Sequence, residues 1–395
     1  TSPKFSDYHA RIMDIIEEFG DRHGFVEYSK TFRLNRAICQ IIDEAEVAIQ
    51  NYQWDVAQAI LDSIAISGED ILYCGDDSAG ELGDIMHYCF QKWHQLSSDQ
   101  LLPEGKKSEL FELSLTHFAE GCLKDFDWWW DWMQIAVQLA DDEEKQERII
   151  RELDKGIDVK GDEWGVNHNR QVAQRHKLEI LSRRGTQEDQ LKFMYENVAN
   201  PDFRRRLLQM FWDQGDFDEV LRLAKDGAVH DSERLGLVND WHKWELKVYR
   251  QTCDYEGSLR LSQYFFFNGG RFAEEEYSME SMYYQMKSIV PKEGWKDFVE
   301  TLLKEAAGNR LHHRMLYVYS QEKMWDRYME YLRKTPVIFE LDEAPVEVWT
   351  LYKDELIQLY AACVKSFFQR ASSRNAYCEG VSMLRKLIQY GGRAE

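Results

Sequence analysis

The sequence predicts an all-α fold in which antiparallel helix pairs stack into a superhelix. Only 6 of the 395 residues are proline, and long segments are rich in Leu, Glu, Lys and Arg, which favours helices over sandwiches and barrels. Apolar residues make up 44% of the chain and aromatic residues 13%, enough to bury a large core. A third observation is a helical corner that recurs along the chain, as expected of a repeat array.

Helical spacing of apolar residues is evident from the start of the chain. A cap at Ser6 or Asp7 precedes the first helix. In the first part of the chain, helices are expected at residues 6–19, from about 25 to 50, and at 52–64, 81–96, 107–121, 126–140 and 143–155. Residues 68–80 are rich in glycine and aspartate and are predicted to form a loop.

Residues 154–165 contain three glycines without sustained periodicity and are the expected joint between two regions. We therefore divide the chain into a less regular N-terminal helical arm, 1–157, and a helical-repeat region, 158–395, within one continuous solenoid. Helices are expected at 166–183, 187–197, 201–213, 217–226, 232–251, 255–267, 271–289, 294–307, 310–320, 323–333, 353–371 and 375–390. The run VIFEL, within 335–345, lies between two prolines and is expected to be a short extended piece.

The recurring corner is clearest at residues 214–227, QGDFDEVLRLAKDG. Gly215 makes the turn, and Phe217 and Val220 are expected to fill the gap between two helices. Similar aromatic-led pairs are Trp54/Ala57, Tyr255/Ser258, Trp295/Phe298, Trp325/Tyr328 and Tyr377/Gly380. The pairs that begin at 217, 255, 295 and 325 are 38, 40 and 30 residues apart. Each helix pair must stack on its neighbours to bury its apolar face.

Two resemblances follow from these residues. The stretch 210–226, MFWDQGDFDEVLRLAKD, resembles the middle of a tetratricopeptide repeat, so the array is expected to be TPR-like in its second half. Over much of the chain the order of features resembles the C-terminal helical region of bacterial SWIM zinc-finger proteins. Its blocks are FVEYSKTFRLNRAI, GDDSAGELGDIM, KDFDWWWDWM, QGDFDEVLRLAKDG and ELIQLYAACVKSFFQRASSRNAYCEGVSMLRKL.

The SWIM resemblance implies a cytoplasmic parent protein in which a zinc module, CxC followed by CxH, precedes the helical region. This sequence contains neither CxC nor CxH, so the resemblance places the metal site upstream of Thr1. Both ends of the sequence are expected to be cuts in a longer protein. Seven widely spaced cysteines also fit reduced thiols in the cytoplasm better than a disulfide framework.

Charge disfavours direct nucleic-acid binding by the segment. Its 49 basic and 70 acidic residues give a net charge of −21, which repels phosphate backbones. The one compact basic run is FRRRLL, with Arg204, Arg205 and Arg206, which could contact an acidic partner or a nucleic-acid end. The alternative is a solvated helix face that pairs with Asp202 and Glu196.

Trp128, Trp129, Trp130 and Trp132 form the densest aromatic cluster. A stacking platform for bases is one interpretation. Helical geometry instead predicts that most of the cluster packs between helices, with Trp130 pointing elsewhere. The interleaved aspartates also argue against nucleic acid.

No recognisable catalytic, cofactor or metal motif occurs. GxSxG, GxxxxGK[ST], HExxH and GxGxxG are all absent. Cys74, His87, Cys89 and His94 have a spacing that matches no common zinc pattern. No apolar run reaches the roughly 18 residues that a membrane span needs. We therefore expect no enzyme activity, no cofactor, no metal and no membrane partner.

The leading hypothesis is a non-catalytic protein-interaction scaffold, the C-terminal helical-repeat part of a larger SWIM-type zinc-finger protein. Repeat arrays of this kind bind partners on extended concave surfaces. The alternative is a nucleic-acid-associated helical array that binds directly, with the basic run and the tryptophan cluster as contacts.

Overall fold

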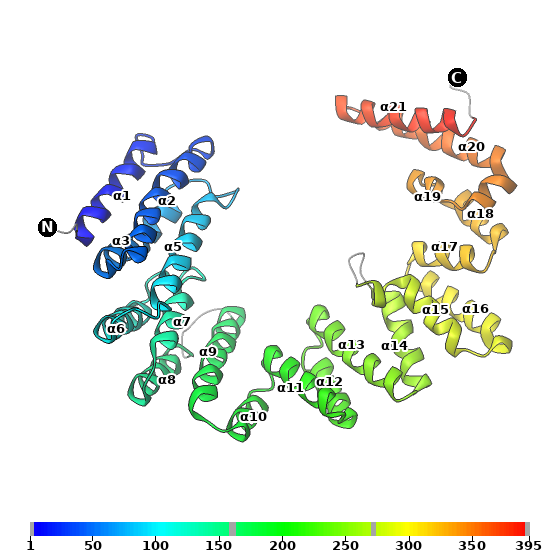
Figure 1. Cartoon of the computed structure of the whole chain (residues 1–395). Coiled ribbons are helices and arrows are strands. Elements are labelled where there is room, and N and C mark those ends of the chain that lie inside the picture. Colours follow the sequence, from blue (N-terminus) through cyan, green and yellow to red (C-terminus); the bar gives the residue numbers. More distant parts are fainter. Residues whose placement is uncertain (1–3, 158–162, 270–273, 392–395) are drawn as a thin grey trace. The chain divides into compact units, whose positions relative to one another are not determined.

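A computed structural model describes residues 4–157, 163–269 and 274–391 of the chain. Within these ranges there are 21 α-helices, α1 to α21, one short 3-10 helix and no β-strand. The nearest approach to a sheet is an isolated bridge between Val26 and Gly75. The predicted all-α class is confirmed (Figure 1). No helix in these ranges combines the length and the apolar character needed to cross a bilayer.

The chain divides into two compact units, Thr1–Met210 and Phe211–Glu395, and the division falls inside α11. Residues 158–162, in the expected joint near 157, lie outside the described ranges, so that boundary remains a prediction. The helices of the first unit are α1 (Phe5–Phe19), α2 (Tyr28–Gln50), α3 (Trp54–Ile66), α4 (Gly68–Tyr73), α5 (Glu81–Ser97), α6 (Glu104–Glu120), α7 (Trp129–Leu139), α8 (Glu143–Ile157), α9 (Glu163–Arg184), α10 (Gln187–Glu196) and the start of α11 (Pro201–Gln214).

In the second unit, helices that are close in sequence pack on one another: α12 on α13, α13 on α14, α14 on α15, α16 on α17, α17 on α18, α18 and α19 on α20, and α20 on α21 (Figure 1). The elements of the second unit after the end of α11 are α12 (Phe217–His230), α13 (Leu235–Gln251), α14 (Tyr255–Asn268), the 3-10 helix η1 (Glu275–Tyr277), α15 (Met279–Ile289), α16 (Lys292–Gly308), α17 (His312–Gln321), α18 (Trp325–Lys334), α19 (Ile338–Asp342), α20 (Val346–Arg370) and α21 (Arg374–Gln389).

Five connections between consecutive helices share one backbone geometry, which we call the hairpin joint. Each has a residue in the left-handed conformation two positions before the next helix begins. These residues are Tyr52, Gly215, Cys253, Arg310 and Lys323, with φ between 54° and 75°. The next helices begin at Trp54, Phe217, Tyr255, His312 and Trp325.

The joints also share a hydrogen-bond pattern, the Schellman motif that ends many helices. At the α17–α18 joint, the Lys323 amide donates to the Ser320 carbonyl at 3.2 Å and the Met324 amide to the Tyr319 carbonyl at 2.8 Å. Equivalent bonds occur at the other four joints. Because these bonds satisfy carbonyls at the end of one helix, the chain can begin the next helix at once.

The aromatic-led pairs are explained in part by this geometry. Ala57, Val220, Ser258 and Tyr328, the fourth residues of their helices, are buried as expected. The expectation that Tyr255 fills the gap between two helices is wrong, because this first residue of α14 is 66% exposed. Gly257 instead lies against the Tyr249 ring. The Trp295 pair is also not at a joint, because α16 already begins at Lys292.

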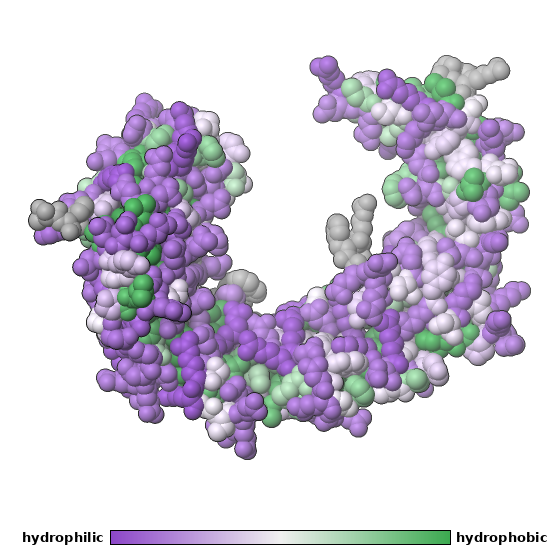
Figure 2. All heavy atoms as spheres, viewed as in Figure 1, coloured by the Kyte–Doolittle hydropathy of each residue, from purple (hydrophilic) through white to green (hydrophobic). Residues whose placement is uncertain are grey.

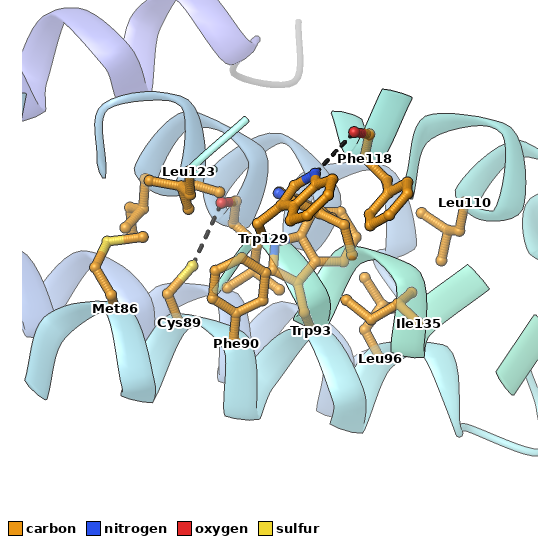
Figure 3. Close-up of a cluster of buried hydrophobic side chains, with 14 of the residues drawn as sticks. Met86, Cys89, Phe90, Trp93, Leu96, Leu110, Phe118, Leu123, Trp129 and Ile135 are labelled. Atoms are coloured by element: carbon orange, nitrogen blue, oxygen red, sulfur yellow. Dashed lines mark hydrogen bonds between the residues drawn. The ribbon is translucent and has the colours of Figure 1, made fainter. Parts of the chain in front are cut away.

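The first unit encloses a continuous apolar core, shown in part in Figure 3. Phe90 and Trp93 rise from α5 toward Trp129 of α7 and Phe118 of α6. The Trp129 indole N–H donates to the Phe118 carbonyl at 2.8 Å, and their rings stack 4.4 Å apart. Trp132 is fully buried and makes edge contacts with Phe90 and Trp93. The prediction that the cluster is mainly helix packing is confirmed.

Two local predictions fail. Residues 68–73 of the expected loop form α4, which packs Ile71 into the core. The run expected to be extended forms α19 instead, because no strand in the described chain is available to pair with it, and its backbone bonds locally from the Leu341 amide to the Val337 carbonyl. Only Val337, which precedes α19, is extended.

Candidate functional site

The strongest candidate site is an open groove of about 760 Å³ in the second unit, which we call the α19–α21 groove. It is lined by the segment around α19, the C-terminal half of α20, and α21. Phe339, which lines it, is 68% exposed, and Val337 is 44% exposed. Figure 2 shows hydrophobic side chains at the surface around α19, among the hydrophilic side chains that cover most of the face shown.

Local sequence explains why these apolar side chains stay at the surface. Pro336 precedes α19, and Pro345 is the N-cap of α20, so α19 has only five residues. One turn of helix can bury one side of itself only. Leu341 takes the buried position at 0% exposure, and Phe339 is left facing out.

The contact between α20 and α21 forms the opposite side of the groove. Gly380 of α21 lies so close to Phe368 of α20 that an added Cβ would meet the ring at 2.5 Å. The Ser373 hydroxyl caps α21 by accepting from the Ala376 amide at 3.2 Å. This pair of helices is therefore tightly joined on one side while Ser382 and Met383 face the groove.

Charged groups lie along the rim of the groove. Asp342 accepts from Lys386 at 2.8 Å and from the Tyr390 hydroxyl at 3.1 Å, and the Asp342 carboxylate raises the pKa of Lys386. Arg370 is exposed, and its guanidinium bonds only to Ser366 among the described residues. Burial, and then the charge of Asp342, raises the pKa of Tyr360 at the base of the groove.

The groove has no recognisable catalytic arrangement. Its lining contains no histidine. The Cys363 thiol donates to the Pro336 carbonyl at 3.4 Å, and burial raises its pKa, which disfavours the reactive thiolate. The Ser382 hydroxyl donates to the Cys378 carbonyl. The groove is therefore suited to binding apolar groups.

A second hollow, of about 860 Å³, lies in the first unit between α7, α9, α10 and α11. Trp130 and His176 line it with their rings 5.9 Å apart, and the Trp130 indole donates to Asn169 at 3.1 Å. Burial, and then the charge of Arg175, lowers the pKa of His176 to about 4, so the imidazole is neutral at pH 7. The Trp130 ring also packs on the rings of Trp129 at 4.8 Å and Phe118 at 5.4 Å, so the expectation that it points away from the cluster is wrong.

The three arginines of the basic run lie in different environments. Arg204 is buried, at 4% exposure. Arg205 pairs with Asp202 at 3.1 Å, as the alternative interpretation expected, whereas Glu196 pairs with Lys192. Arg206 is exposed and lines the hollow of the first unit. Of the three arginines, Arg206 is therefore the exposed one.

The Cys/His group has separate local roles. The Cys74 thiol donates to the Ile71 carbonyl. The Cys89 thiol, labelled in Figure 3, donates to the Leu61 carbonyl. His94 lies 3.0 Å from Asp131, and His87 is exposed. Within the described residues, no group of three or more His, Cys, Asp or Glu is placed to hold a metal.

Sequence reasoning missed the groove. Two signals were present: a short apolar run between two prolines, and a basic C-terminal stretch. Residues 365–389 contain five basic residues and one acidic residue, although the whole chain has a net charge of −21. Neither signal specifies that three short surfaces meet in one concavity.

Comparisons with known proteins identify no family. No family model matches the chain, and no curated protein matches it. A solved structure described as a circular tandem repeat protein with novel repeat topology and enhanced subunit contact surfaces is 12% identical. The alignment covers 99% of this chain and 96% of that one, with a TM-score of 0.22. At this TM-score the assignment of the fold rests on the helices of this chain alone.

Proposed function

We propose that this chain is a non-catalytic scaffold that binds a protein partner through the α19–α21 groove. The observation that carries the proposal is the groove itself, where Phe339 and Val337 remain exposed beside an apolar concavity. Exposed apolar surfaces with polar rims are typical of protein-binding sites. By the SWIM resemblance, the chain is the helical-repeat part of a cytoplasmic bacterial zinc-finger protein and recruits partners for the zinc module.

Chemistry of the groove also supports a binding role. Catalytic sites commonly place a nucleophile within hydrogen-bond reach of a base. In this groove the thiol and the serine hydroxyl donate to backbone carbonyls instead. The charged residues of the groove suit an interaction surface: Lys386 forms an ion pair with Asp342, Arg370 bonds to a serine among the described residues, and Glu379 also lines the groove.

The experiment is a quantitative affinity capture with the full chain and two variants. Ser382→Trp places a large side chain in the groove from an exposed position. Arg374→Glu changes an exposed residue of the same helix that does not line the groove, and serves as the matched control. We expect at least one protein to be retained by the wild type and the control and lost by Ser382→Trp.

A parallel titration with duplex DNA and with RNA tests the alternative function, direct binding of nucleic acid by this chain. We expect no binding at moderate salt, because the net charge of −21 opposes it. Salt-sensitive nucleic-acid binding that is unaffected by Ser382→Trp, together with no groove-dependent protein, would contradict the proposal.

A further inference from the structure

We propose that the Glu340 carboxyl is a pH-sensitive latch between α19 and α18, which holds α19 more firmly in mild acid than at neutral pH. Glu340 lies in α19, and Val337 and Phe339 of the same segment line the α19–α21 groove. The latch therefore sets how firmly one wall of the groove is held. It concerns the local stability of α19 and goes beyond the proposed function, because it operates whether or not a protein binds in the groove.

The first observation is the placement of the two carboxyl oxygens of Glu340. Oε1 accepts a hydrogen bond from the Tyr331 hydroxyl of α18 at 3.2 Å. Oε2 is buried and has no hydrogen-bond partner among the described residues. A buried oxygen without a donor has lost its hydration without replacement, and this costs the charged carboxylate more than the neutral carboxyl. The surroundings of Glu340 therefore favour its protonated form.

The second observation is the set of titratable groups that face Glu340. Among the described residues, the cationic group whose charge acts on it is the exposed imidazole of His312 in α17, and the His312 ring lies 5.4 Å from the Tyr331 ring. On the α18 side, burial, and then the charges of Glu340 and Glu343, raise the pKa of Tyr328 to about 12. Within the described chain, no charged group of α20 affects the pKa of Glu340.

Burial decides the protonation of Glu340. It outweighs the hydrogen bond from Tyr331 and the charge of His312, and it raises the pKa of the Glu340 carboxyl above its ordinary value of 4.5. Glu322, in the same unit, shows the opposite balance. Burial raises its pKa too, but hydrogen bonds from three donors, one of them a lysine, lower the pKa overall. Glu340 has one hydroxyl donor, so its charged form is poorly compensated.

The third observation is the small size of α19. The helix has five residues between Pro336 and Pro345, and Leu341 is its one buried residue. Segments that bury little apolar surface open locally at a low free energy. A charge on Glu340 is therefore large relative to the free energy that keeps α19 docked.

The direction of the pH effect follows from the raised pKa. When α19 is released, the Glu340 carboxyl is hydrated and titrates near its ordinary value of 4.5. Between that value and the higher pKa of docked α19, the docked form binds a proton that the released form does not. The contribution of the latch is therefore complete below this window and is lost as the pH rises through it.

The test is hydrogen exchange of the full chain, measured by mass spectrometry on peptides that cover residues 336–345, between about pH 5 and about pH 7.5. Each exchange rate is compared with that of an unstructured peptide of the same sequence at the same pH, which removes the chemical effect of pH on exchange. We expect the protection of α19 to fall by about threefold or more over this range.

Variants assign the effect to one carboxyl. Glu340→Gln keeps the size of the side chain and can still accept from Tyr331, but it cannot ionise, so α19 should stay protected at neutral pH without the fall. Glu343→Gln removes an exposed carboxylate of the same segment and is the matched control, which should retain the fall. His312→Asn should also retain it. Far-UV circular dichroism of each variant verifies that the fold is kept.

The outcomes are distinct. A fall in protection that persists in Glu340→Gln would overturn the latch, as would wild-type protection that stays constant or increases as the pH rises. Loss of the fall in His312→Asn would assign the pH response to the imidazole and would equally reject the proposal. None of these measurements uses a partner protein, so failure of the latch leaves the proposed function standing, and failure of the affinity capture leaves the latch standing.

Discussion

Two junctions between helices, one in each unit, solve the same packing problem with different chemistry. In the first unit, Trp132 is surrounded by Phe90, Trp93 and the ring of His117 at centroid distances of 5.0, 5.4 and 4.6 Å. In the second unit, Glu322 stands at the end of α17 and accepts hydrogen bonds from two neighbouring helices. One junction depends on aromatic volume and the other on a shared carboxylate.

The Glu322 junction is compact. One carboxylate oxygen accepts from the Tyr283 hydroxyl at 2.5 Å, from Lys287 at 2.7 Å and from the Trp295 indole at 3.0 Å. Tyr283 and Lys287 belong to α15 and Trp295 to α16, so one side chain joins three consecutive helices. Burial raises the pKa of Glu322, but the bonds from Lys287, Tyr283 and Trp295 outweigh it and lower the pKa overall.

The comparison shows that an array of helix pairs does not need identical joints. The hydrophobic effect that buries the aromatic rings of the first unit is non-directional, although the rings themselves prefer edge or offset contacts. Hydrogen bonds to one carboxylate fix a narrower geometry, which suits the short α17 between the joints at Arg310 and Lys323. Substitutions at the two junctions should therefore lower the unfolding free energy by different amounts, and these losses should depend differently on pH.

The largest effect is expected for Trp132→Ala. Removing a fully buried indole leaves a cavity that costs about 4 kcal/mol of unfolding free energy, because the side chain is 0% exposed. Denaturant unfolding measures the loss, and hydrogen exchange should locate it in α5–α7. Trp128→Ala, at a half-buried neighbour, is the matched control and should cost less than half as much. Equal costs would contradict the central role of Trp132.

Glu322→Ala should lower the unfolding free energy by about 2 kcal/mol, because it leaves the Tyr283 hydroxyl and the Trp295 indole without their acceptor. Hydrogen exchange should increase in α15, α16 and α17 together. Glu330→Ala, which removes an exposed ion pair with Lys334, is expected to change stability by less than about 0.5 kcal/mol. Exchange confined to α17 would show that the carboxylate does not join the three helices.

The first unit is expected to lose stability in mild acid through His176. Its pKa is lowered from an unfolded value of 6.5 to about 4, so between these values the unfolded chain binds a proton that the folded chain does not. Stability should therefore fall as pH is lowered through this window, by up to about 1.4 kcal/mol per pH unit. His176→Gln should reduce this slope, as measured by unfolding at several pH values. An unchanged slope would contradict the assignment.

The smallest effect concerns the hairpin joints. Lys323 has φ of 54°, a conformation that costs a side-chain-bearing residue more than it costs glycine. Lys323→Gly should therefore raise the unfolding free energy by about 0.5–1 kcal/mol. At the equivalent position, Gly215→Ala should lower it by a similar amount, since Gly215 has φ of 75°. Effects of the same sign at both positions would show that the joints are not equivalent.

Much of the fold follows from sequence patterns. Apolar spacing predicted most helices, including α2, α5 and α12 to α18, because that spacing is local. Gly215 revealed one joint because glycine is the usual residue in the left-handed conformation. The tryptophan cluster was correctly predicted to be mainly packing, since its positions on one helix are a matter of local geometry.

Features set by contacts between distant residues were not predictable in this way. Tyr52, Cys253, Arg310 and Lys323 adopt the same turn as Gly215, although side chains disfavour it, because the packing of the flanking helices holds them there. Likewise, the run VIFEL has the composition of a strand, but most of it forms part of α19. Its exposed side chains line a groove together with α20 and α21.

Composition and periodicity by themselves determined the all-α class, the acidic surface and the positions of most helices, because these depend on neighbours within a few turns. Tertiary structure alone decided where joints form without glycine, which carboxylate links three helices, and where an apolar groove stays open. These features depend on which surfaces meet after the chain has folded, and the sequence of a single helix does not specify which other helix will pack against it.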